Sequence, residues 1–303
     1  MSNVVPWADT DRRIGATAVL FGADAGRYPF GNSVMVQGSE GVVMIDPSLS
    51  LVARGGAPAV VDRILVSHAH EDHFCGAHVF PDASVHVHHA DAPGLRTLDG
   101  FLDIYGMPDP MRAQWAEEVV EKFFFTSRAN TIEFEHGDTF DLGTVRVEVV
   151  HLPGHTRGHS GFLIEPDGVF FVADIDLSTF GPYYGDHWSD LEDFERSIAA
   201  CREIDARHYA TFHHKGVVDS RPDFLDALDR FAAVIAERDA KILTFLCEPH
   251  TLEEMVEHRF VYRPNVDLMF ASHVERRTAT LHLERLLSDG AVIELSPGLY
   301  RAA

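Results

Sequence analysis

The sequence VSHAHEDHF, residues 66–74, places four side chains of metal-binding type within six positions: His68, His70, Asp72 and His73. The residues that lead into it, 64–67, have the pattern of a buried strand, so we expect the four side chains on a loop before a helix. Histidine offers a neutral ring nitrogen and aspartate a hard anionic oxygen, a combination that suits zinc, iron or manganese. The stretch therefore predicts a metal site at the end of a strand.

The spacing inside this stretch indicates two metal ions rather than one. Residues two apart in an extended chain face the same way, so His68 and His70 can bind one ion. Asp72 and His73 are displaced around the turn and can bind a second ion. A chance polar loop at a strand end is the alternative, and it does not account for four ligand-type side chains at this spacing.

The pattern HxHxDH resembles the signature of the metallo-β-lactamase superfamily, and the chain carries that family's remaining ligand motifs in the same order. LPGHTRGHS contains His155, VFFVADIDLS contains Asp174, and TFHHKG contains His213 and His214. The resemblance covers roughly residues 15–220. It implies an α/β (α+β) fold, the four-layer αββα sandwich, with the metal site at one edge between its two sheets.

The resemblance also implies which residues bind each ion. His68, His70 and His155 would bind the first ion, Asp72, His73 and a late histidine the second, and Asp174 would bridge the two. In the family the late histidine stands before a glycine or a short Lys-Gly turn, which favours His214 over the alternative, His213. The other member of this pair would point away, because adjacent residues in an extended strand face opposite sides.

A dinuclear site of this kind would hydrolyse its substrate. Two cations about 3.5 to 4 Å apart and bridged by water generate hydroxide near neutral pH and stabilise the substrate oxygen that gains charge. Asp72 is expected to orient that hydroxide through its free carboxylate oxygen. In the loop STFGPYYGDHWSD, residues 178–190, Tyr183 and His187 are candidates to stabilise an oxyanion or donate a proton. Phe180 and Tyr184 are expected to line the pocket beside them, unless these aromatic side chains only pack the loop against the sheet.

Three further polar residues are expected near the ligands. His159, four residues after His155, is predicted to orient a ligand rather than to bind an ion. Asp46, at a strand end, resembles the acidic residue near the family's metal site and is expected to support that site. Asp176 either supports Asp174 in the same way or caps the next turn.

The composition narrows the class of protein. The 303 residues are 46% hydrophobic, and 47 Asp and Glu against 25 Lys and Arg give a formal charge of -22, while 19 residues are histidine. This acidity disfavours nucleic acid and anionic membranes as partners, because both are bound through cationic side chains. We expect a cytoplasmic protein, because the three cysteines are widely spaced and the sequence shows no basic and apolar leader. We expect no membrane segment, because no long apolar run is found.

Patterns along the chain predict two parts, a catalytic domain over residues 1–220 and a C-terminal extension over residues 221–303. In the first part, β-branched runs alternate with turns and helical stretches, which is typical of helices packed on sheets. A helix is expected over residues 110–125, with a lid over the active site as the alternative to a core-facing role. Its apolar stripe consists of Met111, Trp115, Val119 and Phe123.

The C-terminal extension resembles a winged-helix module, because helices are followed by a terminal hairpin, AVIELSPGLYRAA. A nucleic-acid reader would concentrate Lys and Arg on its recognition helix. Here the arginines interleave with acidic residues: Glu275, Arg276, Arg277, Glu284, Arg285 and Asp289. We therefore expect the extension to pack against the catalytic domain or to form a homodimer.

Two functions from different classes agree with these residues. A dinuclear hydrolase would cleave a small-molecule ester, thioester, lactone or phosphodiester through a metal-bridging hydroxide, and it would use every ligand found. A mononuclear non-haem iron dioxygenase resembling the persulfide dioxygenases would use the first-metal residues and leave the second site empty. We predict the hydrolase, with two divalent ions, zinc ahead of iron or manganese; the charge disfavours a nuclease. Membership of the superfamily does not by itself imply antibiotic hydrolysis.

Overall fold

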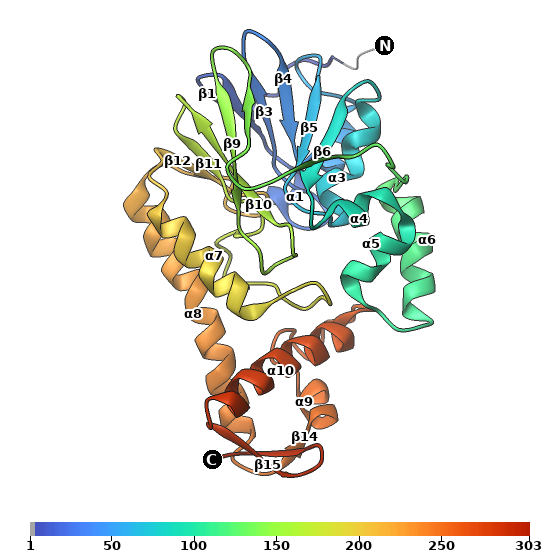
Figure 1. The fold of residues 1–303 in the computed structure, drawn as a ribbon, viewed down its shortest axis with the longest axis vertical. Coiled ribbons are helices and arrows are strands. Elements are labelled where there is room, and N and C mark those ends of the chain that lie inside the picture. The colour runs from blue at the N-terminus through green and yellow to red at the C-terminus, as the bar shows by residue number, and fades with distance from the viewer. Residues whose placement is uncertain (1–3) are drawn as a thin grey trace.

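The computed structural model describes residues 4–303, and within them most strands form two large sheets that face each other (Figure 1). The first sheet contains seven strands in sequence order. They are β1 (Arg12–Ile14), β2 (Thr17–Leu20), β3 (Ser33–Gln37), β4 (Val42–Ile45), β5 (Arg63–Val66), β6 (Ser84–His88) and β7 (Ile132–Phe134). The strands from β1 to β4 pair antiparallel, and those from β4 to β7 pair parallel.

The second sheet contains six strands in the order β13-β12-β11-β10-β9-β8. They are β8 (Thr139–Asp141), β9 (Arg146–His151), β10 (Ser160–Glu165), β11 (Val169–Phe171), β12 (His208–Ala210) and β13 (Val217–Val218). Neighbouring strands are antiparallel except for β11 and β12, which are parallel. As a result, β9, β11 and β12 all end at the same edge of the sheet.

Alternating side chains divide the molecule into four layers. In β4, Val43 and Ile45 pack between the sheets with residues such as Val149 and Phe162, whereas Met44 packs with the helices on the outer face. Successive side chains of a strand point to opposite faces, so a strand that is apolar throughout is buried on both. The predicted αββα sandwich is confirmed.

Helices cover the outer face of each sheet (Figure 1). The helices on the first sheet are α2 (Leu49–Arg54), α3 (Glu71–Phe74), α4 (Ala92–Arg96), α5 (Leu98–Tyr105) and α6 (Met111–Phe123), and those on the second are α7 (Leu191–Glu203) and α8 (Arg221–Phe245). The helix expected over residues 110–125 is α6. Its residues Trp115, Val119 and Phe123 are buried in the core, and Met111 is half-buried.

The C-terminal part has its own small core. Phe224 and Phe231 in the first half of α8 pack beside the second sheet, whereas Ile242 packs with Met255 and Leu283 away from it. Helix α8 is therefore shared by both cores, and a domain boundary at residues 220/221 stays a prediction. The terminal hairpin is present, and a further strand pairs with it. The elements of this part are β14 (His250–Thr251), α9 (Leu252–His258), α10 (Ala271–Ser288), β15 (Val292–Ser296) and β16 (Leu299–Ala302), with the sheet order β14-β16-β15. Two short helices precede it in the chain, α1 (Ala23–Gly26) and the 3-10 helix η1 (Cys75–Val79).

Cys75 and Cys201 are buried, Cys247 is exposed, and all are free thiols. In residues 4–303, every helix is too short or too polar to cross a lipid bilayer. Residues 1–3, which belong to the N-terminus expected to lack a leader, lie outside the described part of the chain. A cytoplasmic location and a homodimer stay predictions.

Candidate metal centre

The predicted ligands come together at one edge of the sandwich because each follows the carboxyl end of a strand that reaches this edge. His68 follows β5, whose neighbours β4 and β6 run parallel to it. His155, Asp174 and His213 follow β9, β11 and β12, which share one direction in the second sheet. Strand ends from both sheets thus surround one space between them.

The first group of ligand-type side chains contains only histidines: His68, His70 and His155. His68 Nε2 lies 3.1 Å from His70 Nδ1 and 3.1 Å from His155 Nε2. All three side chains are buried. Three ring nitrogens that converge at such distances fit a common cation, which each of them can bind through its lone pair.

The second group contains Asp72, His73 and His213, which are also buried. Asp72 Oδ2 lies 3.2 Å from His213 Nε2, and Asp72 Oδ1 lies 3.8 Å from His73 Nε2. A carboxylate with two imidazoles is a set of ligands typical of zinc, iron and manganese sites.

Asp174 lies between the two groups. Its Oδ1 atom is 3.2 Å from His73 Nε2, and its Oδ2 atom is 3.3 Å from His155 Nε2 and 3.9 Å from His213 Nε2. One carboxylate therefore reaches histidines of both groups, as a bridging ligand must. This is the position that the family resemblance implies for Asp174.

The ring nitrogens that face away from the centre are held by the protein. His155 Nδ1 donates to the carbonyl oxygen of Tyr183 at 2.8 Å, and His213 Nδ1 donates to that of Gly26 at 2.8 Å. His73 Nδ1 lies 2.8 Å from Asp46 Oδ2, which gives Asp46 the supporting contact that the sequence predicts. Such contacts orient the rings of metal-bound histidines and set which nitrogen carries the proton.

His159 and Asp176, the other two residues expected to support the ligands, both bind backbone groups. His159 Nδ1 donates to the carbonyl oxygen of Leu152 at 2.9 Å, and its Nε2 accepts the backbone N–H of Asp174 at 3.2 Å. It therefore holds the backbone of Asp174, and its ring centroid lies 5.1 Å from that of His68 and 5.5 Å from that of His155. Asp176 accepts the N–H of Ser178 at 2.9 Å, so of its two alternatives the turn cap is observed.

Burial and neighbouring charges shift the proton affinities of the centre. Burial disfavours the charged form of His68, and His73 and His155 add repulsion, so the pKa of His68 lies well below its usual range. Burial alone would raise the pKa of Asp174, but His73 and His213 outweigh it and hold that pKa well below its usual range. Against the opposing effect of burial, the carboxylates Asp174 and Asp72 raise the pKa of His73 well above its usual range and that of His213 to about 9. A bound metal ion would therefore replace a proton on these two rings.

Unsatisfied polar atoms show that the residues fit metal ions. His73 Nε2 and Asp174 Oδ1 lie 3.2 Å apart and are buried, yet neither has a hydrogen-bond partner among residues 4–303. A buried polar atom without a partner is destabilising, and a cation between these two atoms would satisfy both. The donor set therefore suits a pair of divalent cations, the first near His68 and the second near Asp72.

The structure corrects the preference for His214 as the late ligand. The side chain of His214 is 41% exposed, and its Nε2 atom lies 3.8 Å from Asp176 Oδ2, outside both groups. His214 has a left-handed backbone conformation, with φ of 54°, because the chain turns there after β12. This turn directs His213 into the centre and His214 away from it. The position of His214 directly before Lys215 and Gly216 therefore does not identify the ligand.

The loop over residues 178–190 divides its aromatic side chains between two places. Phe180 and Tyr183 line the cavity beside the centre, as predicted. Tyr184 is instead buried, with its hydroxyl 2.8 Å from His282 Nε2. His187 is exposed and lies outside the cavity, so the structure does not bring it to the centre, and its catalytic role stays a prediction. Its backbone N–H donates to the carbonyl oxygen of Tyr105, which directs the side chain outward.

The C-terminal extension packs against this loop and holds it. Arg277 in α10 donates to the carbonyl oxygens of Asp186 and Ser189 at 3.2 and 2.9 Å. Arg238 in α8 donates to those of Phe180 and Pro182 at 2.9 and 2.6 Å. Arg277, one of the arginines weighed above for nucleic-acid contact, is thus engaged within the chain.

Two acidic residues close to the ligands were missed from the sequence. Asp186 Oδ2 lies 3.1 Å from His70 Nε2, and its Oδ1 accepts the hydroxyl of Tyr183 at 3.1 Å. Asp91 is buried and accepts the N–H groups of Ala69 and Gly158 at 2.9 and 2.6 Å, which joins the loops that carry His68 and His155. Asp186 could have been suspected from its place in the loop after Asp174, whereas no local pattern distinguishes Asp91.

We expect the Asp186→Asn variant to bind metal about 10- to 100-fold more weakly than the unaltered protein, with little change in thermal stability. The charge of the carboxylate, 3.1 Å from His70 Nε2, favours a proton on that nitrogen and leaves Nδ1 free to face His68, whereas an amide lacks this charge. Metal affinity is measured by competition with a chromophoric chelator. Asp193→Asn, on the surface of α7, is the control, and an unchanged affinity in Asp186→Asn would contradict this role.

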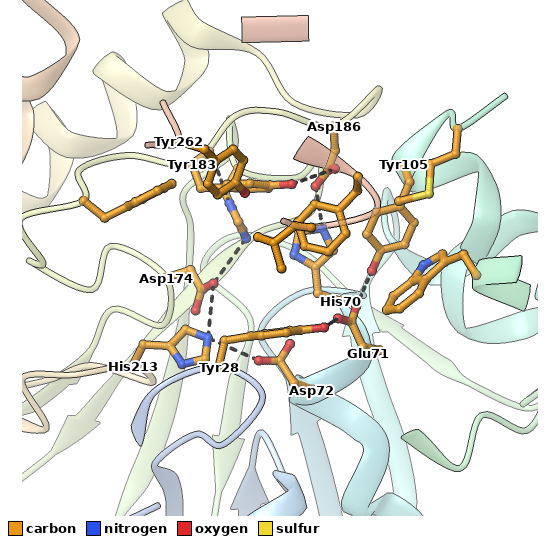
Figure 2. Close-up of a pocket in the computed structure, with 16 residues that line it drawn as sticks. Tyr28, His70, Glu71, Asp72, Tyr105, Asp174, Tyr183, Asp186, His213 and Tyr262 are labelled. Carbon is orange, nitrogen blue, oxygen red and sulfur yellow. Dashed lines mark hydrogen bonds and ion pairs between the residues drawn. The ribbon is translucent and has the colours of Figure 1, made fainter. Parts of the chain in front are cut away.

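A cavity of about 280 Å³ opens beside the two groups of ligands (Figure 2). Its walls come from distant parts of the chain: Tyr28 near the N-terminus, Tyr105 at the end of α5, Trp115 in α6, and Tyr262 between α9 and α10. Trp115 belongs both to the hydrophobic core and to the cavity wall, so α6 is a core helix that also borders the site.

Comparison with known sequences agrees with this architecture. The family model described as the metallo-beta-lactamase superfamily matches residues 26–236. Acyl-coenzyme A thioesterase MBLAC2 of Bos taurus is 30% identical over 169 residues, which are 49% of this chain and 60% of that protein. A hydroxyacylglutathione hydrolase of Maricaulis maris is 32% identical over 101 residues, 31% of this chain and 40% of that protein. The matches thus span less than two thirds of these relatives.

Solved structures extend the likeness of the fold to nearly the whole chain. A metallo-beta-lactamase family protein from Thermus thermophilus superimposes with a TM-score of 0.69 at 23% identity, over 95% of this chain and 99% of that one. A beta-lactamase domain protein from Burkholderia ambifaria does so with a TM-score of 0.68 at 16% identity, over 100% and 96%. With the ligand motifs brought together at the edge of an αββα sandwich and a family match over most of its length, the chain belongs to the metallo-beta-lactamase superfamily.

Proposed function

We propose that the protein is a hydrolase that uses two divalent metal ions, zinc in the first instance, to cleave a small-molecule thioester. The observation that carries this proposal is the position of Asp174, within 3.3 Å of histidines from both ligand groups. A bridging carboxylate keeps two ions close enough to act on one substrate bond. The thioester is chosen because two of the relatives, an acyl-coenzyme A thioesterase and a hydroxyacylglutathione hydrolase, are named for such substrates.

The geometry favours two ions over the single iron of a dioxygenase. A mononuclear enzyme needs only the group that contains His68, His70 and His155. Here Asp72, His73 and His213 are brought together as well, buried and within reach of one another. A mononuclear dioxygenase would leave this second group empty, whereas the dinuclear hydrolase uses it, so the group supports the hydrolase.

When bound, the ions would supply Lewis acidity and would lower the pKa of a water molecule so that it is nucleophilic near neutral pH. The protein contributes the remaining functions. The carboxylate of Asp72 is proposed to accept a hydrogen bond from the attacking water and thereby orient it. Tyr183, whose hydroxyl donates to Asp186 at 3.1 Å in the cavity wall, is proposed to position the substrate next to the centre.

Metal analysis and turnover together test the proposal. Protein purified without chelator is examined by elemental analysis and then assayed with a thioester of N-acetylcysteamine, using release of the free thiol as the readout. Two zinc ions per chain with thiol release, lost after chelation and restored by zinc, are expected. One iron per chain with oxygen uptake and no thiol release would overturn the proposal and favour the dioxygenase.

A further inference from the structure

The cavity beside the metal centre has an apolar and aromatic wall without positive charge. Met107, Trp115, Leu268 and Phe270 form its apolar part, and among the described residues that line the cavity there is no lysine or arginine. The carboxylates that line it, apart from the ligands Asp72 and Asp174, belong to Glu71 and Asp186. Any anion inside would therefore have only the metal ions to balance its charge.

The two additional carboxyl groups already have their hydrogen-bond donors. Glu71 is buried and accepts the hydroxyl of Tyr28 at 2.8 Å and, at its other oxygen, the hydroxyl of Tyr105 (Figure 2). Asp186 accepts the hydroxyl of Tyr183. These phenolic O–H groups point at acidic residues of the wall, so they are engaged before a substrate enters. A carboxylate on the substrate would have to compete with Glu71 and Asp186 for them.

The apolar wall is held in place by the protein. Leu268 and Phe270 lie in the connection between α9 and α10, where Tyr262 also reaches the cavity. The buried carboxylate of Glu275 accepts the N–H of Phe260 at 2.8 Å and that of Tyr262 at 2.7 Å, which anchors the start of this connection. A wall with fixed backbone offers a preformed surface to an apolar group.

The size of the cavity limits what it can hold. A volume of about 280 Å³ lies near the lower end of the range of small-molecule sites, about 300 to 1,000 Å³. The reacting carbonyl must lie at the ligand groups, so the rest of this volume is available to the chain attached to it.

We infer that the cavity binds the acyl group of the substrate, and that this group is uncharged and apolar. The inference rests on the proposed function and adds the class of acyl group to it. Acyl groups that end in a carboxylate are excluded, because burying an anion among carboxyl groups without a cationic partner is costly. Very short acyl groups are poor substrates because they leave the apolar wall exposed to water.

A matched set of thioesters tests the inference. Octanoyl, adipyl and acetyl groups are each attached to N-acetylcysteamine, a neutral thiol, and octanoyl and adipyl have equal numbers of non-hydrogen atoms. The zinc-loaded protein is expected to show a kcat/KM at least about 100-fold higher for octanoyl than for adipyl, because the latter places a carboxylate in the cavity. Equal values for octanoyl and adipyl would overturn the inference and leave the proposed hydrolase intact.

A binding measurement separates failure of the inference from failure of the proposed function. Two thioethers of N-acetylcysteamine serve as probes, one with an octyl chain and one with a matching chain that ends in a carboxylate. Neither can be hydrolysed, because both lack the thioester carbonyl. Calorimetry is expected to detect the octyl compound and to find the carboxylate at least about 10-fold weaker. If the octyl compound binds and no thioester is cleaved, the inferred pocket stands and the proposed function fails. Equal binding of both, or of neither, overturns the inference.

A cation placed at the rim should weaken the preference for an uncharged acyl group. Leu268 lines the cavity with 40% of its surface exposed, so Leu268→Arg adds a cation without disturbing the core. The variant is expected to raise the adipyl-to-octanoyl ratio of kcat/KM at least about 10-fold, because a cation then pairs with the adipyl carboxylate. Ile293→Arg, 38% exposed on β15 and outside the cavity, is the matched control and should leave the ratio unchanged. An unchanged ratio in Leu268→Arg contradicts the placement of the acyl group.

Discussion

The Asp174→Ala variant is expected to lose its bound metal and at least about 1,000-fold of its hydrolytic rate while it keeps its fold. The two carboxylate oxygens of Asp174 lie 3.2 Å from His73 Nε2 and 3.3 Å from His155 Nε2, so alanine removes an oxygen ligand from both ions. His70→Ala is expected to behave similarly, because it removes one of the nitrogens of the first group. Elemental analysis and thiol release, measured on the same preparations, give metal content and rate.

The fold should survive because the loop of Asp174 is anchored by its backbone. The N–H of Asp174 donates to His159 Nε2 at 3.2 Å, and this contact does not involve the side chain that is removed. Circular dichroism and thermal unfolding of the metal-free proteins check this point. Asp176→Asn is the matched control, since Asp176 caps a turn at Ser178, and it should retain both ions. An Asp174→Ala protein that is free of metal and fully active would rule out the dinuclear mechanism.

The two adjacent histidines after β12 are expected to differ sharply when each is replaced by alanine. His213→Ala should retain about one of two ions and lose at least about 100-fold in rate, because His213 Nε2 lies 3.2 Å from Asp72 Oδ2 in the second group. His214→Ala should retain both ions and stay within about 3-fold of the original rate, because its side chain is 41% exposed and directed away. Metal per chain after extensive dialysis distinguishes the two.

Each of these variants is the control for the other, because they remove the same side chain from neighbouring positions. Loss of metal in His214→Ala together with full metal in His213→Ala would mean that the turn after β12 is arranged differently in solution. Equal loss in both would instead point to general damage to this turn, in which His214 has its left-handed backbone conformation, and would refute the assignment of His213 alone.

Much of the centre could be predicted from sequence because its ligands follow strand ends. The spacing of His68, His70, Asp72 and His73 determines their directions locally, since side chains two apart in extended chain face the same side. His155 and Asp174 followed from the family resemblance, and the structure brings both to the same edge. The choice between His213 and His214 could not be made in this way, because it depends on a single backbone turn.

The cavity could not be predicted, because its wall is assembled from contacts that are remote in sequence. Glu71 stands inside the recognised motif, but its partners Tyr28 and Tyr105 are 43 and 34 residues away. His187 illustrates the opposite case: its place in the loop after Asp174 suggested a catalytic residue, and packing of that loop against Tyr105 directs it to solvent.

The sequence by itself determined the superfamily, the αββα sandwich and most of the ligand-type residues, because closely spaced motifs at apolar strands constrain local geometry. Only the tertiary structure decided which late histidine enters the centre, which loop side chains reach the cavity, and that the C-terminal extension supplies Leu268 and Phe270 to its wall. Those outcomes depend on which distant surfaces pack together, and packing is specified by the whole fold rather than by any one segment.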